Sequence, residues 1–151
     1  MNILFNISNH PSNTWDDNQK KGWDDIIDIP FPNIDPRLSW GQVSAIASNL
    51  IADNLGLVLA FHSGDTDMPE DSSFYFMVQG DFTLCYALVP KIRRFGKLAL
   101  PTSDRLVSVN PDGSKNVKFR FVAWRIDGVT KLDAPKGVIV NADDLPLWRV
   151  V

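Results

Sequence analysis

The sequence predicts an α/β fold with a mainly parallel sheet and a β-hairpin near its C-terminal end. Short apolar runs that are typical of buried strands alternate with stretches whose apolar residues recur at helical spacing. One run, residues 74–80, is apolar on both faces, which is typical of a strand in the middle of a parallel sheet. Two alternating runs flank a Pro-Asp-Gly turn at 111–113, and this pattern predicts the hairpin.

The N-terminal half of the chain predicts two strands and two helices. In chain order, we expect a strand over 2–8, a short polar helix over 13–21, a strand over 25–31 and a helix over 40–54. Ser12 or Asn13 would cap the first helix, whereas Pro30 and Pro32 stop the second strand. Ser39 stands directly before apolar residues at helical spacing, so we expect it to be the N-cap of the second helix.

The C-terminal half predicts three more strands and a hairpin. In chain order, we expect a strand over 55–64, a polar loop over 65–73, a strand over 74–80, a helix over 81–95, a strand over 97–103 and a hairpin over 105–125. Pro90 should kink or interrupt the helix, because proline has no N–H to donate. In the hairpin, Phe119, Phe121 and Ala123 alternate with the residues between them, which predicts one buried and one more exposed face. Residues 137–140 are a candidate for a short extra strand.

Composition and charge limit the classes of function. A chain of 151 residues is long enough for a single domain over 1–151, in which roughly 68–70% of the unfolded chain's surface is buried. The net charge of −3 argues against a protein that binds duplex nucleic acid, but it is compatible with a small anion held by local groups. The single cysteine, Cys85, excludes an intrachain disulfide, and it falls within the apolar pattern of a predicted helix.

The sequence indicates a soluble cytoplasmic protein without a metal cluster. The first residues have no basic leader, and no apolar run approaches the roughly 18 residues of a membrane span. Only two histidines, His10 and His62, accompany the single cysteine, so a zinc cluster is not expected. The acid-rich stretch at 65–71 does not have the spacing of an EF-hand, and a solvated loop is the simpler interpretation.

Polar side chains follow the carboxyl ends of four predicted strands. These are Ser8, Asn9 and His10; His62, Ser63 and Gly64; Gln79, Gly80 and Asp81, with Phe82 and Thr83 after them; and Thr102, Ser103, Asp104 and Arg105. Ligands of open α/β sheets bind beyond this edge. Hydroxyls, amides and glycine predominate there, which suits a phosphate or a ribose. The sequence therefore predicts a site for a phosphate-containing ligand.

Two interpretations of the stretch after residue 79 remain open. Gly80 would let the backbone approach a ligand, the helix that begins at Asp81 or Phe82 would direct free N–H groups at an anion, and Arg105 would add a charged contact. Alternatively, Gly80 only makes a tight turn and Asp81 is an ordinary N-cap. Neither a Walker loop nor a G-x-G-x-x-G motif is present in the sequence, which argues against a nucleoside triphosphatase or a dinucleotide enzyme.

Other candidate residues also have a plain structural interpretation. His10 follows a strand end and precedes a proline, so it is either a general acid or base or a residue that stabilises a turn. Trp15, Trp23 and Trp40 are either core and interface residues or a platform on which bases stack. The sequence alone leaves these alternatives open.

Five segments resemble, in order, a family of small CRISPR-associated proteins with a CARF-like domain, related to the ring nucleases of type III CRISPR signalling. The segments are NILFNISNHP, IIDIPFPNIDP, MVQGDFTLCYALV, LPTSDR and VKFRFVAWR, and the resemblance covers roughly residues 2–125. It implies a CARF-like domain with a Rossmann-like three-layer sandwich. It also implies that the chain binds, and can cleave without metal, a cyclic oligoadenylate messenger of antiviral defence. Residues 126–151 have no counterpart and are interpreted as a dimer arm or an addition peculiar to this chain.

The resemblance assigns roles residue by residue. Ser8, Asn9 and His10 correspond to the first ligand loop, residues 79–83 to the loop and helix start that face the phosphates, and Thr102 and Ser103 to a motif that also contains Arg105. Asp81 departs from the glutamate expected after Gly80, which puts that position in doubt. His10 and Arg105 would be catalytic, the ribose 2′-hydroxyl would be the nucleophile, and no cofactor is implied. A symmetric ligand favours a homodimer.

Other functions remain possible for the same residues. The first is a sensor or sponge that binds the nucleotide without cleaving it. The second is a structural or interaction protein whose polar strand ends are merely loops. The third is an enzyme that acts on a nucleoside or a sugar phosphate in the same pocket.

Overall fold

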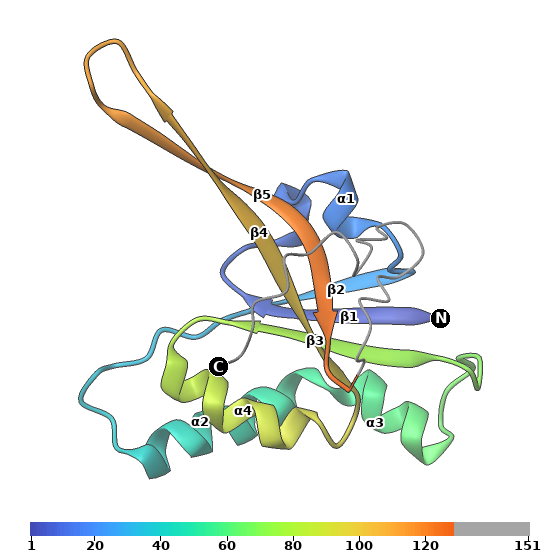
Figure 1. The fold of residues 1–151 in the computed structure, drawn as a ribbon. Helices are drawn as coiled ribbons and strands as arrows, with labels where there is room; N and C mark the ends of the chain where they lie inside the picture. The colour runs from blue at the N-terminus through green and yellow to red at the C-terminus, as the bar shows by residue number, and fades with distance from the viewer. Residues whose placement is uncertain (129–151) are drawn as a thin grey trace, which may run out of the picture.

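The structure, a computed structural model, describes residues 1–128 and has a mixed α/β fold (Figure 1). Its elements are β1 (Asn2–Ser8), the 3-10 turn η1 (Ser12–Thr14), α1 (Asp17–Lys20), β2 (Asp25–Pro30), α2 (Trp40–Asn54), α3 (Gly56–Ser63), β3 (Ser73–Gln79), α4 (Phe82–Ile92), β4 (Lys97–Val109) and β5 (Lys115–Ile126). The five strands form one sheet in the order β2-β1-β3-β4-β5. The first four run parallel, and β5 is antiparallel to β4.

The two central strands are buried on both faces, as the sequence predicts for the run at 74–80. β3 lies between β1 and β4, and six consecutive residues of β1, from Ile3 to Ser8, are buried. Phe5 of β1 and Phe76 of β3 are register partners, and their rings stack with centroids 5.2 Å apart. Strands buried on both faces need apolar residues without alternation, which is why β1 and β3 were predictable.

Three helices cover one face of the sheet. α2, α3 and α4 lie together below the strands in Figure 1, and α1 lies on the opposite side. The core beneath the three helices includes Val43 and Leu50 of α2, Val58 of α3 and Leu88 of α4. On the sheet side, Phe5 and several other apolar residues of β1 and β3 belong to the same core.

A smaller second core lies on the α1 face. It contains Leu4, Met77 and Ala99 from the sheet, together with Trp15 and Trp124. The rings of Trp15 and Trp124 approach with centroids 5.8 Å apart. Trp124 also donates its indole N–H to the carbonyl of Gln19 in α1 at 3.1 Å. This tryptophan therefore fixes β5 against a helix more than a hundred residues earlier in the chain.

The predicted cap of α2 is confirmed. The Ser39 hydroxyl accepts from the Gln42 N–H at 3.4 Å, and Gln42 Oε1 accepts from the Ser39 N–H at 2.9 Å. This reciprocal pair is a capping box, which satisfies two backbone donors that the helix itself cannot satisfy. The sequence pattern of this cap lies in four consecutive residues, so it can be predicted without knowledge of the tertiary structure.

Pro90 lies inside α4, which continues for two residues beyond it and ends at Ile92. Proline has no N–H to donate to the carbonyl one turn earlier, so α4 lacks one backbone hydrogen bond at this position. Because Pro90 lies in the last turn, the distortion affects only the end of the helix. Leu84 and Leu88 are buried on the inner face of the helix. Cys85 is half-buried beside them, and burial raises the pKa of its thiol, so it packs as a neutral side chain.

The predicted strand at 55–64 is wrong, because this segment is the helix α3. Its backbone makes helical hydrogen bonds, such as Leu59 N–H to the Leu55 carbonyl at 3.0 Å, and it ends at Gly64 in the left-handed region with φ 78°. A short apolar run cannot be assigned to strand or helix by periodicity alone. The segment GLVLAFHS is mostly apolar, so its pattern suits a buried strand as well as a buried helix. In the structure it follows α2 after a single residue.

Two other boundaries differ from the prediction. The helix expected over 13–21 is divided into η1 and α1, and its cap is Asp16, which accepts from Gln19 N–H at 3.0 Å. The strand expected over 97–103 does not end there, because β4 continues to Val109 as the first arm of the hairpin. The candidate strand at 137–140 and all but the first three residues of the extension at 126–151 lie outside the described residues.

Much of the β4–β5 hairpin extends beyond the rest of the sheet (Figure 1). β3 pairs with β4 only at Tyr75–Lys97 and Phe76–Leu98, whereas β4 and β5 pair from Ala99–Ile126 to Val109–Lys115. The register shifts between Thr102 and Ser103, where β5 contains one extra residue. An irregularity of this kind bends a ribbon and re-aims its side chains, and it lies where the hairpin leaves the sheet.

Within residues 1–128, no single helix is long and apolar enough to cross a membrane. The pair α2 and α3 reaches the required length and composition only when taken together, with a bend of 66° at the break.

Candidate ligand pocket

The chain leaves β1 through a loop that a buried hydrogen-bond network holds in place. Asn6 is fully buried, and its Nδ2 donates to the His10 carbonyl at 2.8 Å and to Asp28 Oδ1 at 2.7 Å. The Ser8 hydroxyl donates to Asn6 Oδ1 at 2.6 Å and accepts from the His10 N–H at 3.1 Å. Asp28 of β2 also accepts from the Ser12 N–H at 3.0 Å and the Ser12 hydroxyl at 2.8 Å. The network therefore fixes the main chain around His10.

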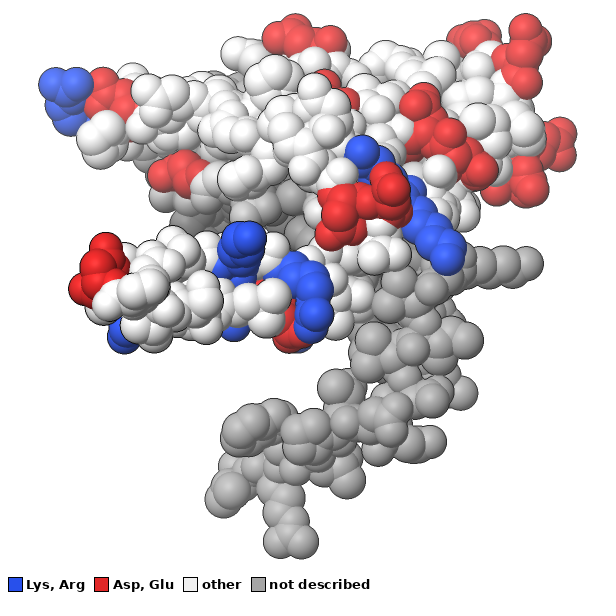
Figure 2. Space-filling model, turned by 90° about the horizontal axis from the view of Figure 1, so that it is seen from above, with Lys and Arg blue, Asp and Glu red and all other residues white. Residues whose placement is uncertain are grey.

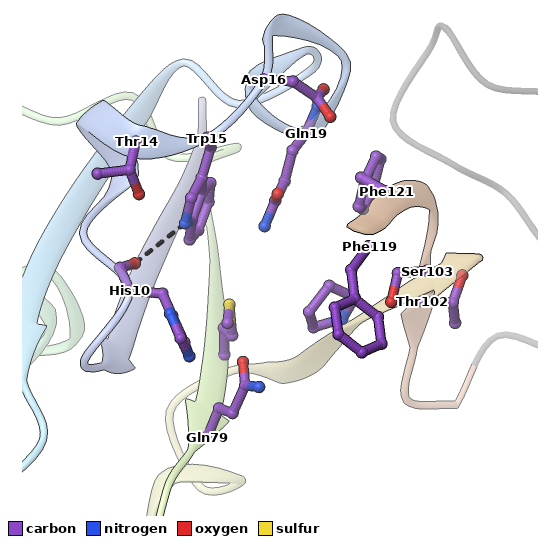
Figure 3. A pocket seen from close by; sticks show the side chains of 12 residues that line it. His10, Thr14, Trp15, Asp16, Gln19, Gln79, Thr102, Ser103, Phe119 and Phe121 are labelled. Carbon is purple, nitrogen blue, oxygen red and sulfur yellow. Dashed lines mark hydrogen bonds between the residues drawn. The ribbon is translucent and has the colours of Figure 1, made fainter. Parts of the chain in front are cut away.

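His10 is held by its backbone, and its imidazole is exposed. Besides the bonds above, the His10 carbonyl accepts from the indole N–H of the buried Trp15 at 3.0 Å, the bond drawn in Figure 3. The side chain points into the pocket, toward Gln79 (Figure 3). Because three hydrogen bonds fix the backbone and leave the ring free, His10 is positioned for contact with a ligand.

A cavity of about 630 Å³ opens between this loop, β3 and the base of the hairpin. Twelve residues from these segments line it: His10, Thr14, Trp15, Asp16, Gln19, Met77, Gln79, Pro101, Thr102, Ser103, Phe119 and Phe121. Its volume falls within the range of roughly 300–1,000 Å³ that is usual for small-molecule sites. The carboxyl ends of β1 and β3 both contribute, and these two strands are neighbours in the sheet.

Aromatic rings form opposite walls of the pocket. Trp15 stands on the side of the β1 loop, and Phe119 and Phe121 stand on β5 across from it (Figure 3). Phe119 is 70% exposed although it is a large apolar residue. Phe121 packs against Trp124 with ring centroids 5.5 Å apart, so its position is fixed by the second core. A flat ring could enter between these walls and stack.

The polar groups of the pocket are mainly neutral. Gln79 offers an amide and Ser103 a hydroxyl, and both residues are exposed. The Thr102 hydroxyl is already engaged, since it donates to the Ala123 carbonyl at 3.1 Å and accepts from the Ala123 N–H at 3.2 Å. Among the lining residues that lie within 1–128, Asp16 is the only carboxylate and none is a lysine or arginine. The pocket therefore suits a polar aromatic ring better than a bare polyphosphate.

Four of the predicted site residues come together in this pocket: His10, Gln79, Thr102 and Ser103. Ser8 is buried and serves the loop network described above. Asn9 is exposed beside it. The prediction that Thr102 and Ser103 follow the end of a strand is wrong, because both residues lie within β4. They reach the pocket because the hairpin passes over the edge of the sheet.

The residues after Gln79 lie outside the pocket lining. A Cβ on Gly80 would overlap the ring of Phe31, so glycine is needed there for packing. The Asp81 carboxylate accepts from the Leu84 N–H at 2.9 Å as the N-cap of α4. Both findings favour the structural interpretation of Gly80 and Asp81. At the start of α4, Phe82 is 82% exposed, and Thr83 is exposed too.

Arg105 lies on the hairpin next to the pocket. Its register partner in β5 is Phe119, and Ser103 pairs with Phe121. Paired residues of an antiparallel ladder point to the same side. Arg105 therefore shares a face of the hairpin with Ser103 and both phenylalanines, one step further from the sheet. It is placed to reach a group at the mouth of the pocket.

His62 does not belong to this site. It lies on α3, and its Nδ1 donates to the Val58 carbonyl at 2.9 Å. With Phe61 and Phe74 it lines a separate cavity of about 220 Å³. The prediction that His62, Ser63 and Gly64 follow a strand at the ligand edge is wrong, because the segment is a helix.

The aromatic walls were the main part of the site that sequence reasoning missed. The alternation predicts that Phe119 and Phe121 share one face of a hairpin, but nothing in the sequence indicates that this face turns toward residue 10. For Trp15 the sequence leaves a core role and a stacking role both open. Its distance of five residues from His10, across a tight turn, was the available signal. Among residues 1–128, no group of three or more His, Cys, Asp or Glu side chains is placed to hold a metal ion.

The chain belongs to the uncharacterized protein MJ1673 family, whose model matches residues 2–125. The match spans the whole sheet except the last residue of β5. It therefore includes every residue that lines the pocket. Neither a curated protein nor a solved structure matches the chain.

Proposed function

We propose that the chain binds a small adenine nucleotide, specifically a cyclic oligoadenylate messenger, in the pocket between β1, β3 and the hairpin. The observation that carries the proposal is the position of the pocket. After β1 the chain turns toward β2, and after β3 it turns toward β4 on the other side. Strand ends that diverge in this way form the crevice where open α/β sheets bind ligands. His10 and Gln79 stand at these two ends.

The lining supports recognition of a nucleobase. Stacking on an aromatic ring is worth about 1–3 kcal/mol per base. Trp15, Phe119 and Phe121 supply such rings on both sides. The amide of Gln79 and the hydroxyl of Ser103 can pair with a base edge or a ribose. In this proposal the base lies between the aromatic walls, and the sugar lies toward His10.

The phosphates would lie at the mouth of the pocket. Arg105 is exposed on the same hairpin face as Ser103 and Phe119, so its guanidinium can reach out over the opening. A guanidinium makes strong paired hydrogen bonds to a phosphate. The described part of the lining contains no lysine or arginine. Affinity would therefore depend more on the bases than on the phosphates.

Cleavage, if it accompanies binding, would need no metal. His10 would accept the proton of a ribose 2′-hydroxyl, whose oxygen attacks the adjacent phosphorus. The new bond from O2′ to phosphorus forms as the bond from phosphorus to O5′ breaks, and the departing O5′ takes up a proton from water, to which His10 returns the proton that it accepted. The products are a 2′,3′-cyclic phosphate and a 5′-hydroxyl. Arg105 would stabilise the charge that develops on the phosphate.

We also propose that the domain is a small Rossmann-like three-layer sandwich of the CARF-like type. The strand order β2-β1-β3-β4-β5 is one of the usual doubly wound orders, with an antiparallel strand at its edge. Helices lie on both sides of the sheet, although within residues 1–128 the α1 side has one short helix and the bent hairpin. A cytoplasmic place in CRISPR-linked antiviral defence belongs to the same proposal and rests on the resemblance alone.

A second candidate is a sensor or sponge that binds the nucleotide without cleaving it. One observation favours it: among the described residues that line the pocket, His10 is the only histidine and Asp16 the only carboxylate. Asp16 already caps α1 through the Gln19 N–H. A cleavage assay on the wild-type chain separates the two candidates.

The first test is a thermal-shift screen with cyclic tri-, tetra- and hexa-adenylate, linear oligoadenylates and common nucleotides. A ligand at 100 times its dissociation constant stabilises the folded state by ~2.7 kcal/mol, which raises Tm by several degrees. Gln79→Ala should weaken binding about tenfold by removing one hydrogen-bonding group. Thr83→Ala is the matched control, since Thr83 is exposed as well but lies at the start of α4.

His10→Ala should abolish cleavage and leave binding within a few fold. If no adenylate shifts the wild-type Tm, the proposed function is wrong. If Thr83→Ala weakens binding and Gln79→Ala does not, the ligand binds at the start of α4, and the pocket is not its site.

A further inference from the structure

The hairpin outside the sheet has one apolar and one polar face. We refer to residues 103–121 as the arm. Its apolar face is built by the register pairs Arg105–Phe119, Val107–Val117 and Val109–Lys115. Its polar face is built by the pairs Asp104–Arg120, Leu106–Lys118 and Ser108–Asn116.

The apolar face of the arm is uncovered within the described residues. Val107 is 50% exposed, Val109 66%, Val117 40% and Phe119 70%. These four side chains are contiguous, because they alternate along two paired strands. Contiguous apolar side chains on a protein surface usually mark an interface. A two-stranded ribbon is also only marginally stable in water by itself, so the arm needs a surface to pack against.

The charge of the hairpin is opposite to that of the body. The part of the hairpin that forms the arm, residues 103–121, contains four Lys or Arg and two Asp, which gives +2. Residues 1–96 contain six Lys or Arg and twelve Asp or Glu, which gives −6. Figure 2 shows acidic side chains spread widely over the face seen from above, whereas basic side chains gather in fewer places. A basic arm on an acidic body is complementary to a second copy of the same chain.

Two cations lie on the apolar face itself. Arg105 and Lys115 flank the valines, whereas on the polar face Arg120 is already paired with Asp104 at 3.0 Å. A partner surface for this face must therefore be partly apolar and partly acidic. The body carries acidic side chains close to the arm's own base, at Asp16 and Asp17 of the α1 region.

We infer that the apolar face of the arm is the dimerisation surface of this protein and that its occupant is a second copy of the chain. In a closed two-fold pair, each arm packs Val107, Val109 and Val117 against the other copy, and Lys115 faces the other copy's acidic body. The patch adjoins the pocket, since Phe119 belongs to both. The inference does not depend on which ligand the pocket binds.

The test is the mass of the full-length chain by sedimentation and by light scattering from 1 to 100 µM. We expect a dimer whose dissociation constant rises between 50 mM and 500 mM NaCl, because screening weakens the charge complementarity. Val107→Lys should raise that constant at least tenfold. Ser108→Lys adds the same charge one residue away on the polar face, and it should change the constant less than twofold.

Val109→Lys is a second variant on the apolar face, in case Val107→Lys does not fold. Far-ultraviolet circular dichroism should match the wild type for each variant that is compared. A wild-type monomer at 100 µM overturns the inference, whether the arm then proves to be covered by residues of its own chain or to bind an oligonucleotide. Equal effects of Val107→Lys and Ser108→Lys, or a dimer that is insensitive to salt, overturn it as well.

Discussion

Replacing Asn6 with alanine should destabilise the protein by about 3 kcal/mol and loosen the loop that presents His10. Asn6 is fully buried and makes three side-chain hydrogen bonds, to Asp28, to the His10 carbonyl and from the Ser8 hydroxyl. A bond to a neutral group contributes about 1 kcal/mol, and a bond to a charged group about 1.5–3 kcal/mol. The sum is roughly 3.5–5 kcal/mol.

Part of this loss is recovered, because two partners keep other hydrogen bonds. The His10 carbonyl still accepts from Trp15 Nε1 at 3.0 Å, and Asp28 still accepts from Ser12 at 2.8 Å. The net cost is therefore about 3 kcal/mol. For a domain of this size, 1 kcal/mol corresponds to about 2–4 °C in Tm, so the expected fall is about 6–12 °C.

The assay is equilibrium urea unfolding of the two purified proteins, with calorimetry for Tm. Asn9→Ala is the matched control, since Asn9 is exposed in the same loop and should change stability by about 0.5 kcal/mol at most. A loss below about 1 kcal/mol for Asn6→Ala would refute the reasoning that this network holds the loop.

Three further predictions concern the rest of the fold. Gly80→Ala should cost about 1–3 kcal/mol in urea unfolding, because its Cβ would overlap Phe31; Gly56→Ala, with open space around it, should cost nothing or stabilise. Ser39→Ala should lower the free energy of unfolding by about 1 kcal/mol, and an unchanged value would contradict the capping box. The alkylation rate of Cys85 should rise at a higher pH than that of a free thiol, since burial raises its pKa.

Local signals predicted the fold best where they were contained in a few neighbouring residues. The cap at Ser39 and the Pro-Asp-Gly turn depend on side chains and backbone within four residues, so the sequence specifies them directly. The central position of β3 followed from its two apolar faces. By contrast, residues 56–63 are apolar in a pattern that suits a buried strand and a buried helix equally, and the tertiary structure decided between them.

The pocket was predictable only in part for a similar reason. His10 and Gln79 follow strands that any parallel sheet would bring together, so their proximity could be expected. The approach of Phe119 and Phe121 to the pocket depends on the direction in which the hairpin leaves the sheet. The hairpin leaves at a register shift between Thr102 and Ser103, which no local sequence pattern predicts. The same shift explains why Thr102 and Ser103 reach the pocket although no strand ends there.

The most direct test of the proposed site is methyl NMR of the chain labelled with ¹³C at its methionine methyl groups. Met77 lines the pocket and is 1% exposed, whereas Met1 and Met68 lie elsewhere and are internal controls. When the cyclic oligoadenylate that raises Tm is added to saturation, the Met77 signal should shift. The ring currents of aromatic bases in the pocket change the local magnetic field at the Met77 methyl group. The Met1 and Met68 signals should stay in place. A bound ligand that shifts Met68 and leaves Met77 unchanged would contradict the account.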